Sequence, residues 1–217
     1  MNRYDAVIFD LDGTLLDTAE GIFRSVSYAI ETFSLPMPGD DVLSTFIGPP
    51  IQDSFMRIYG MDRDEAMKAA NVFRERYKES DILLAKPYDG IYETIEALRG
   101  AGVKTAVATY KRQDYAEKIL VHFGFDRICD HICGSDFEGK LKKKDIIENA
   151  VKACTITDAK KAVMVGDSDN DALGAAEAKH DFIAALYGFG FKDKEDAGRF
   201  PLVGVAASPK DILRFVL

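Results

Sequence analysis

Short apolar runs recur along the chain, and amphipathic segments of helical length separate most of them. The runs with the length and composition of β-strands are Asp5–Phe9, Val103–Ala108, Ile128–Cys133, Ala162–Val165, Phe182–Leu186 and Leu202–Val205. The segments with helical periodicity include Ile91–Arg99, Asp114–Phe123, Lys144–Ala153 and Asn170–Lys179. Strands that alternate with helices predict parallel pairing, because a parallel connection needs a crossover. The strands are almost continuously apolar, which is typical of a sheet covered on both faces. We therefore predict an α/β fold with a doubly wound, Rossmann-like parallel sheet.

One stretch interrupts this alternation. Residues 17–84 show only helical patterns, separated by prolines and glycines. A crossover between two strands requires only about ten residues, far fewer than this segment contains. We predict an inserted all-helical cap subdomain over residues 17–84 and a core domain formed by residues 1–16 and 85–217. The alternative is a set of long helices that pack directly on the sheet.

The charge balance limits the partners that the chain can bind. It has 28 Lys and Arg against 36 Asp and Glu, a net charge of −8. Nucleic-acid and anionic-membrane surfaces attract basic proteins, so we expect neither partner. A small anionic substrate remains compatible, because one local cationic pocket is enough to bind it. Asp5 and Asp10 interrupt the apolar stretch that a signal peptide would need, so we expect a cytoplasmic protein.

The three cysteines, Cys129, Cys133 and Cys154, are an odd and sparse set that favours reduced thiols. Cys129, His131 and Cys133 lie close enough in sequence to suggest zinc ligands. Along a strand, however, neighbouring side chains alternate between the two faces and could not all converge on one ion. We favour buried apolar filler over a zinc site.

An acidic pair follows the first strand. Asp10 ends the strand, Asp12 comes two residues later, and Gly13 and Thr14 follow. Ligands of open α/β sheets bind beyond the carboxyl ends of the strands. Two-residue spacing on extended backbone points both carboxylates the same way, where they repel each other unless a cation or a proton is present. A hard divalent ion suits such oxygen ligands. The alternative is a surface turn rich in Asp and Gly.

A second acidic cluster, Gly166–Asp171, follows the strand Ala162–Val165 and precedes a helix. A helix cap formed by Asp169 or Asn170 would explain one acidic residue but not three. An EF-hand loop is excluded, because its twelfth position, counted from Asp167, is Ala178 instead of Glu.

Two weaker signals accompany the carboxylates. Thr109 ends the strand Val103–Ala108, where a hydroxyl beside free backbone amides suits a phosphate oxygen; the alternative is a helix-capping Thr. The segment Lys140–Lys144 contains four lysines, most of which we expect on a solvated face. Carboxylates with Mg²⁺, together with Thr and Lys, are typical of a site that handles phosphoryl groups.

These motifs resemble those of the haloacid dehalogenase superfamily of phosphatases, in particular the phosphoglycolate phosphatase-like group with a helical cap. The four family motifs match Asp10–Thr14, Thr109, a lysine, and Gly166–Asp171, in the family's order and over essentially the whole chain. We choose Lys144 as the lysine, from its position after Gly134-Ser135 and before a helix, with Lys143 as the alternate. Tyr187–Gly190 resembles a glycine-rich loop of this group, and we assign it no chemistry.

The resemblance implies a mechanism. Asp10 attacks phosphorus and forms an aspartyl-phosphate, and Asp12 acts as general acid and then as general base. Mg²⁺ is held by Asp10, by the backbone carbonyl of Asp12 and by Asp167. Asp171 acts through a water or orients the lysine. Thr109 and Lys144 bind the phosphate of a small phosphorylated metabolite, and the protein is a monomer or a homodimer.

Two departures from the family pattern stand out. Tyr110 replaces the Asn that often lies between the second-motif hydroxyl and a Lys, which bears on the phosphate loop or the leaving-group pocket. The third motif lacks the Pro that often follows its Lys.

Several other interpretations compete with the phosphatase. A phosphomutase uses the same core, but Thr14 is the phosphatase-like residue where sugar mutases often have Val. A receiver domain is shorter and divides its acidic residues between strands, and an inactive relative would not need four intact motifs. Among phosphatases, phosphoglycolate, nucleoside monophosphates, pyrophosphate and sugar phosphates are all candidate substrates, so a pyrophosphatase also stays open.

Overall fold

The computed structural model describes residues 2–217 and divides into two compact units. The first unit contains the chain up to Asp17 and Pro87–Leu217, and the second contains Thr18–Lys86. The sequence-based boundaries at residues 16/17 and 84/85 lie one or two residues from these. Two short strands, β2 (Leu16–Asp17) and β3 (Lys86–Pro87), mark the junctions.

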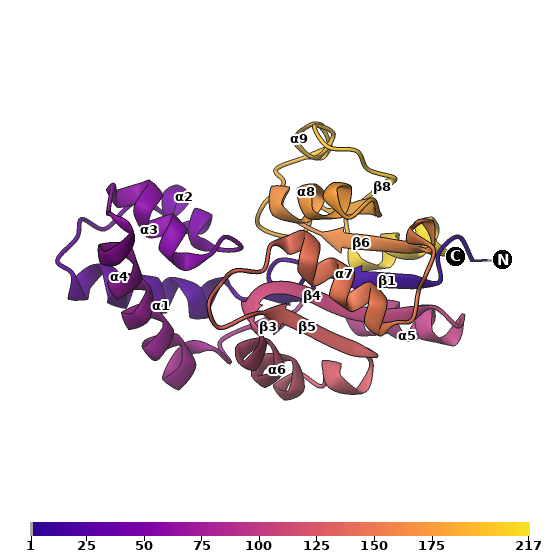
Figure 1. The fold of residues 1–217 in the computed structure, drawn as a ribbon, viewed down its shortest axis with the longest axis horizontal. Helices are drawn as coiled ribbons and strands as arrows, with labels where there is room; N and C mark the ends of the chain where they lie inside the picture. The colour runs from indigo at the N-terminus through magenta and orange to yellow at the C-terminus, as the bar shows by residue number, and fades with distance from the viewer. Residues whose placement is uncertain (1) are drawn as a thin grey trace. The chain divides into compact units, whose positions relative to one another are not determined.

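The first unit alternates strands and helices, as the periodicity predicts (Figure 1). Its remaining strands are β1 (Ala6–Phe9), β4 (Lys104–Arg112), β5 (His131–Ser135), β6 (Ala162–Gly166), β7 (Asp181–Ala185) and β8 (Gly204–Ala206). Its α-helices are α5 (Ile91–Gly100), α6 (Gln113–His122), α7 (Lys143–Ala153), α8 (Asp169–Glu177), α9 (Lys194–Ala197) and α10 (Leu213–Val216). Short 3₁₀ turns are η3 (Phe125–Arg127), η4 (Ala159–Lys161) and η5 (Pro209–Ile212).

These six strands form one parallel sheet in the order β5-β4-β1-β6-β7-β8. β1 lies in the centre, with Phe9 in register with Val107 of β4 and Val165 of β6. The carboxyl ends of these three strands therefore share one edge of the sheet. The doubly wound parallel fold predicted from the sequence is confirmed.

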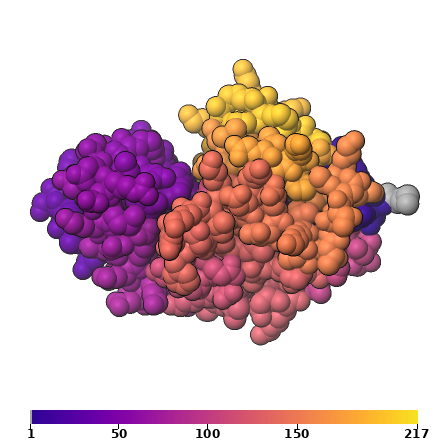
Figure 2. Space-filling view, in the orientation of Figure 1, coloured from indigo at the N-terminus to yellow at the C-terminus, as the bar shows by residue number. Residues whose placement is uncertain are grey.

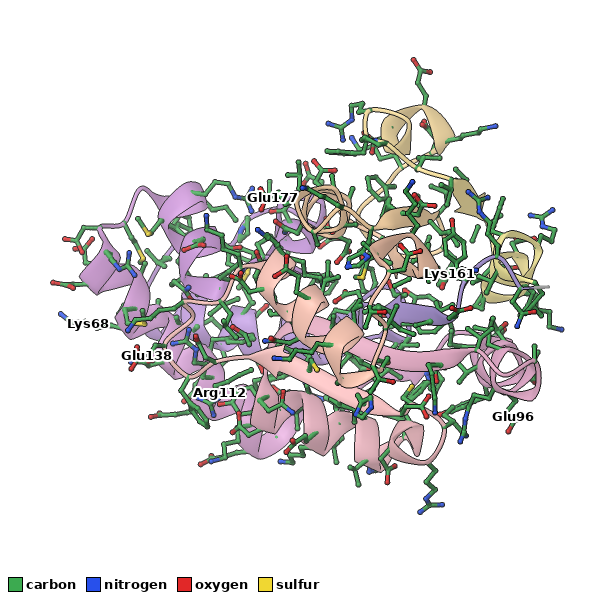
Figure 3. The ribbon with its side chains drawn as sticks, turned by 45° about the vertical axis from the view of Figure 1, so that its right-hand side comes forward. Lys68, Glu96, Arg112, Glu138, Lys161 and Glu177 are labelled. Carbon is green, nitrogen blue, oxygen red and sulfur yellow. The ribbon has the colours of Figure 1, made fainter. Side chains whose placement is uncertain are left out.

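Helices cover both faces of this sheet. Ala6 and Ile8 of β1 lie in a buried cluster with side chains of α7 and α8, including Ile146 and Ala172. The alternating residues Val7 and Phe9 are also fully buried, while α5 packs against β4 and α6 packs against β4 and β5. In Figure 2, atoms of the pink-to-orange segments form much of the face of the first unit that is turned toward the viewer. The exposed carboxylates Glu96 and Glu177 point outward from their helices (Figure 3).

One expected strand begins later than its apolar run suggests. Residues 128–130 precede β5 instead of forming it, because the 3₁₀ turn η3 ends there and Ile128 keeps helical backbone angles. Cys129 is buried, and burial raises the pKa of its thiol to about 12, as expected of an inert apolar filler. The group of potential metal ligands found among residues 2–217 contains neither cysteine nor histidine.

The second unit is helical and holds its own core. Its elements are α1 (Ala19–Thr32), α2 (Asp40–Leu43), the 3₁₀ turn η1 (Ser44–Phe46), α3 (Ile51–Tyr59), α4 (Arg63–Arg76) and the π-helical turn η2 (Tyr77–Asp81). Ile22, Val26 and Ile30 of α1 repeat at helical spacing and are buried, as are Ala66 and Phe73 of α4. α1 and α4 pack against each other.

A buried carboxylate joins the long helices of this unit. Asp81, only 1% exposed, accepts hydrogen bonds from Ser25 Oγ at 2.9 Å and from Arg76 Nε at 3.1 Å. Arg24 Nε lies 3.8 Å from its other oxygen. Because an ionised group is costly to bury without partners, these contacts hold α1, α4 and η2 in register.

None of the helices built by residues 2–217 combines the length and apolar character needed to cross a membrane.

We predict that Asp81→Ala destabilises the second unit by about 2 kcal/mol, because it leaves the buried Ser25 hydroxyl and the arginines without their acceptor. The figure lies below that for a fully buried pair because both arginines are partly solvated. Urea unfolding followed by circular dichroism measures the loss. Glu79→Ala, an exposed change in the same turn, is the control. Equal midpoints for the two variants would contradict the anchoring role.

Candidate active site

The turn after β1 fixes the first acidic motif. The Asp10 amide donates to Val165 O at 2.9 Å, which extends the pairing with β6 by one residue. The chain then folds back, and Leu11 O accepts from the amides of Thr14 and Leu15. Gly13 has a φ of +80°, and a Cβ added there would overlap the Asp167 carboxylate. Glycine is thus required both by the backbone conformation and by the close approach of Asp167.

Asp167 follows β6 and is held by the loop Tyr187–Gly190, to which we assign no chemistry from the sequence. Its Oδ2 accepts from Phe189 N at 2.7 Å and from Gly190 N at 3.1 Å. A Cβ on Gly188 would overlap both the Asp167 side chain and Gly13 O. The glycine-rich run Tyr187–Gly190 therefore fixes one oxygen of a site carboxylate. The two glycines among these four residues, just after a strand, were the sequence signal that could have indicated a role for this loop in the site.

Asp171 supplies a third carboxylate from the first turn of α8. Its Oδ2 accepts from Ser168 N at 3.1 Å and from Ser168 Oγ at 2.7 Å. The helix cap is therefore built on Ser168, and Asp169 and Asn170 do not form it. Oxygens of Asp10, Asp167 and Asp171 all lie within 4.8 Å of one another, and all three residues are buried.

The buried lysine of the site is Lys143, so our choice of Lys144 is wrong. Lys143 Nζ lies 2.6 Å from Asp10 Oδ1 and 2.7 Å from Asp171 Oδ1, and its side chain is 4% exposed. Lys144 points elsewhere, with its Nζ 3.9 Å from Glu148 one turn along α7. Consecutive helical residues point about 100° apart, so only one can face the carboxylates.

A sequence signal for Lys143 did exist. The buried face of α7 consists of Lys143, Ile146, Ile147, Ala150 and Val151. This i, i+3, i+4, i+7 spacing places Lys143 on the apolar stripe, whereas Lys144 and Glu148 form a solvated i, i+4 pair.

The charges of the site are strongly coupled. Burial raises the pKa of Asp10 to about 7, against the opposing effect of Lys143 and with smaller contributions from Asp171 and Asp12. Burial and the neighbouring Asp171 and Asp10 also raise the pKa of Asp167 well above its usual range. For Lys143, burial alone would lower the pKa, but Asp10 and Asp171 outweigh it and raise the pKa above its ordinary value. The ammonium is thus permanently charged at neutral pH.

The side chain of Asp12 does not belong to the cluster of three carboxylates. Its Oδ1 is 3.1 Å from Lys111 Nζ, and both side chains are about nine-tenths buried. The metal contact that the family resemblance implies for the backbone carbonyl of Asp12 stays a prediction.

Thr109 and Tyr110 follow the regular part of β4. Thr109 Oγ1 accepts from Lys111 N at 3.1 Å, and α6 begins only at Gln113, so Thr109 does not cap that helix. Tyr110 Oη accepts from Lys143 N at 2.9 Å, and the Lys143 ammonium lies 5.7 Å from the centre of its ring. The tyrosine at the atypical position thus supports the buried lysine.

The donor set fits a hard divalent cation. Lys143 contacts two of the three carboxylates, so ionisation of all three would leave two negative charges uncompensated within the group. Oxygen ligands that repel one another in a buried site are what Mg²⁺ or Ca²⁺ binds. The arrangement can therefore hold such an ion beside the Lys143 ammonium.

Comparisons with known proteins agree with this chemistry. The family model described as haloacid dehalogenase-like hydrolase matches residues 7–185. A 5′-nucleotidase from Pseudomonas aeruginosa is 39% identical over 193 residues, which cover 88% of this chain and 87% of the relative. A pyrophosphatase from Halalkalibacterium halodurans is 33% identical over 214 residues, which cover 98% of this chain and 96% of the relative.

A solved structure gives the same answer for the fold. The crystal structure of a predicted phosphatase from Clostridium acetobutylicum is 35% identical, with a TM-score of 0.89, and covers 97% of this chain and 99% of that one. Its likeness, together with the matched family model and the motifs at Asp10 and Asp167, confirms the resemblance seen in the sequence and the expected hydrolase activity toward phosphoric monoesters. The chain belongs to the haloacid dehalogenase-like hydrolase family.

Proposed function

We propose that the protein is a Mg²⁺-dependent phosphatase that hydrolyses a small phosphorylated metabolite through an aspartyl-phosphate on Asp10. The observation that carries the proposal is the buried contact of 2.6 Å between Lys143 Nζ and Asp10 Oδ1, beside Asp167 and Asp171. This arrangement combines a carboxylate nucleophile, a permanent positive charge and oxygen ligands at one edge of the sheet.

The first step has an electrostatic difficulty that the site is suited to relieve. A carboxylate that attacks a phosphate is repelled, and two unit charges 4 Å apart interact by about 4 kcal/mol at an effective dielectric constant near 20. The Lys143 ammonium offsets this repulsion and stabilises charge on the transferring oxygens. Thr109 donates its hydroxyl to a phosphate oxygen, as in the family motif that it matches.

Asp12 handles protons in both halves of the reaction. In the first half it donates a proton to the leaving oxygen as the P–O bond breaks. In the second it accepts a proton from the water that hydrolyses the aspartyl-phosphate. Asp12 follows Asp10 by two residues in the matched family motif, which supports this division of roles.

The carboxylates of Asp10 and Asp167 would hold Mg²⁺, with Asp171 close enough to join them. When bound, the ion would neutralise part of the negative charge of the carboxylates and the phosphate. The Phe189 and Gly190 amides orient Asp167 toward this role.

The substrate class rests on chemistry shared by the relatives. One is named a 5′-nucleotidase and another a pyrophosphatase, so a phosphoryl group carried by a small molecule is the common element. The pyrophosphatase relative, which matches almost the whole chain, favours pyrophosphate as a second candidate. The sparse, free cysteines support a cytoplasmic location.

We predict that Asp10→Asn lowers phosphate release by at least about 10³-fold, because the variant lacks the nucleophile. The assay uses phosphoglycolate, nucleoside monophosphates, pyrophosphate and sugar phosphates, each with Mg²⁺ and with a chelator. Asp169→Asn, an exposed change in the fourth motif, should keep wild-type rates. Retained turnover in Asp10→Asn would refute the aspartyl-phosphate mechanism.

We predict that Lys143→Met lowers kcat by about 10²-fold or more, because it removes the charge beside Asp10. Lys144→Met changes the adjacent solvated lysine and should change kcat less than about twofold. Steady-state kinetics on the best substrate of the panel compares them. A larger loss in Lys144→Met would restore our original choice of lysine.

We predict that Mg²⁺ raises the melting temperature more at pH 8 than at pH 6. The raised pKa of Asp10, about 7, means that without metal the folded state keeps a proton that the unfolded state releases. The contribution of Asp10 to the stability of the metal-free protein therefore falls as pH rises from about 4 to 7. Above that range Asp10 has lost its proton, so Mg²⁺ no longer competes with a proton for the carboxylate. Thermal scans with Mg²⁺ or chelator test this. Asp167→Asn should lose most of the shift, and a shift independent of both pH and Asp167 would contradict the proposed ion site.

A further inference from the structure

A second buried lysine has no task in the mechanism above. Lys111 Nζ lies 3.1 Å from Asp12 Oδ1, and the two side chains are 8% and 10% exposed. An ammonium this deeply buried is costly unless an anion or hydrogen-bond acceptor partners it. The contact therefore restrains both side chains, including that of Asp12 in the turn after β1.

The backbone around Lys111 shows why its side chain reaches Asp12. The pairing of β4 with β5 shifts register between Ala108 and Arg112, and such irregularities re-aim side chains. Within this segment the Lys111 amide donates to Thr109 Oγ1 at 3.1 Å. The hydroxyl proposed to bind phosphate and the lysine that contacts Asp12 are thus fixed by one short, irregular strand end.

The two buried lysines divide the acidic residues between them. Lys143 contacts Asp10 and Asp171, which belong to the nucleophile and metal-ligand group, whereas Lys111 contacts Asp12. The carboxylate that exchanges protons therefore has an ammonium partner different from that of the carboxylate that attacks phosphorus.

We propose that Lys111 is a positioning residue that holds the Asp12 carboxyl in line with the leaving oxygen of the substrate. The proposal rests on the proposed phosphatase function and adds to it a residue that governs which leaving groups the enzyme handles well.

The proton balance defines what Lys111 does. In the first half, the bond from Asp10 to phosphorus forms, the bond to the leaving oxygen breaks, and that oxygen takes the Asp12 proton. In the second half, water oxygen attacks phosphorus, the bond to Asp10 breaks, and the water proton passes to Asp12. Lys111 keeps its own protons throughout and acts only through the orientation of Asp12.

This role has a consequence that a general structural role lacks. An alkyl phosphate expels an alkoxide, which needs the proton from Asp12 as the bond breaks. p-Nitrophenyl phosphate expels a phenolate that is stable as an anion, so its departure depends little on a general acid. Loss of Lys111 should therefore slow leaving-group release from the alkyl ester much more than from the aryl ester.

The experiment compares Lys111→Met, Lys111→Arg and Asp12→Asn with the wild type in single-turnover assays, with Mg²⁺ present. The readout is release of the leaving group from the best alkyl phosphate of the panel and from p-nitrophenyl phosphate. We expect Lys111→Met to lose about 10-fold to 100-fold with the alkyl ester and less than about threefold with the aryl ester. Asp12→Asn should show the same discrimination, and Lys111→Arg should recover part of the alkyl rate.

Each other result has a definite meaning. Equal losses for both esters, with a higher KM, would overturn the proposal and assign Lys111 to phosphate binding. Unchanged release in Lys111→Met would show that the contact is dispensable and would also overturn it. Circular dichroism and the Mg²⁺-dependent thermal shift identify a misfolded variant. If Lys111→Met misfolds, the test is whether Lys111→Arg and Asp12→Asn both lose more leaving-group release with the alkyl ester than with the aryl ester. Failure of the proposed function appears separately, as a wild-type protein that releases phosphate from no ester.

Discussion

The site depends on one buried ammonium group. Lys143 contacts Asp10 and Asp171 at once, and without it the pair would bring like charges together in a largely buried region. Removing one partner of such a buried group costs several kcal/mol, because the remaining charges lose their compensation. The surrounding structure serves this contact: Tyr110 binds the Lys143 amide, and the apolar stripe of α7 anchors the helix that carries it.

Close packing is the second constraint on the site. Gly13 and Gly188 leave room for the Asp167 side chain, and Gly166 does the same for Asp171. A Cβ at any of these positions would overlap a carboxylate. The carboxylates can therefore approach one another closely only because the backbone around them carries no side chain there. This arrangement also frees the Phe189 and Gly190 amides to bind Asp167.

Much of the fold and part of the site could be predicted from local patterns. Alternating strands and helices predict the parallel sheet, and its register brings the residues after Phe9, Val107 and Val165 to one edge. The positions of Asp10 and Asp167 at that edge could therefore be predicted. Lys144 was the wrong choice because position along the chain does not fix the direction of a helical side chain, which depends on the helical phase. The hydrophobic stripe of α7 contained that phase.

The sequence by itself determined the fold class, the family and the edge of the sheet at which the chemistry lies, because these depend on periodicity and on motifs within a few residues. The partners of the charged groups that meet in the site were decided only by the tertiary structure. Lys111 with Asp12, Lys143 with Asp10, and the loop amides with Asp167 join residues that lie far apart in the chain. Local sequence patterns do not encode such pairings, because they follow from how strands, turns and helices pack against one another.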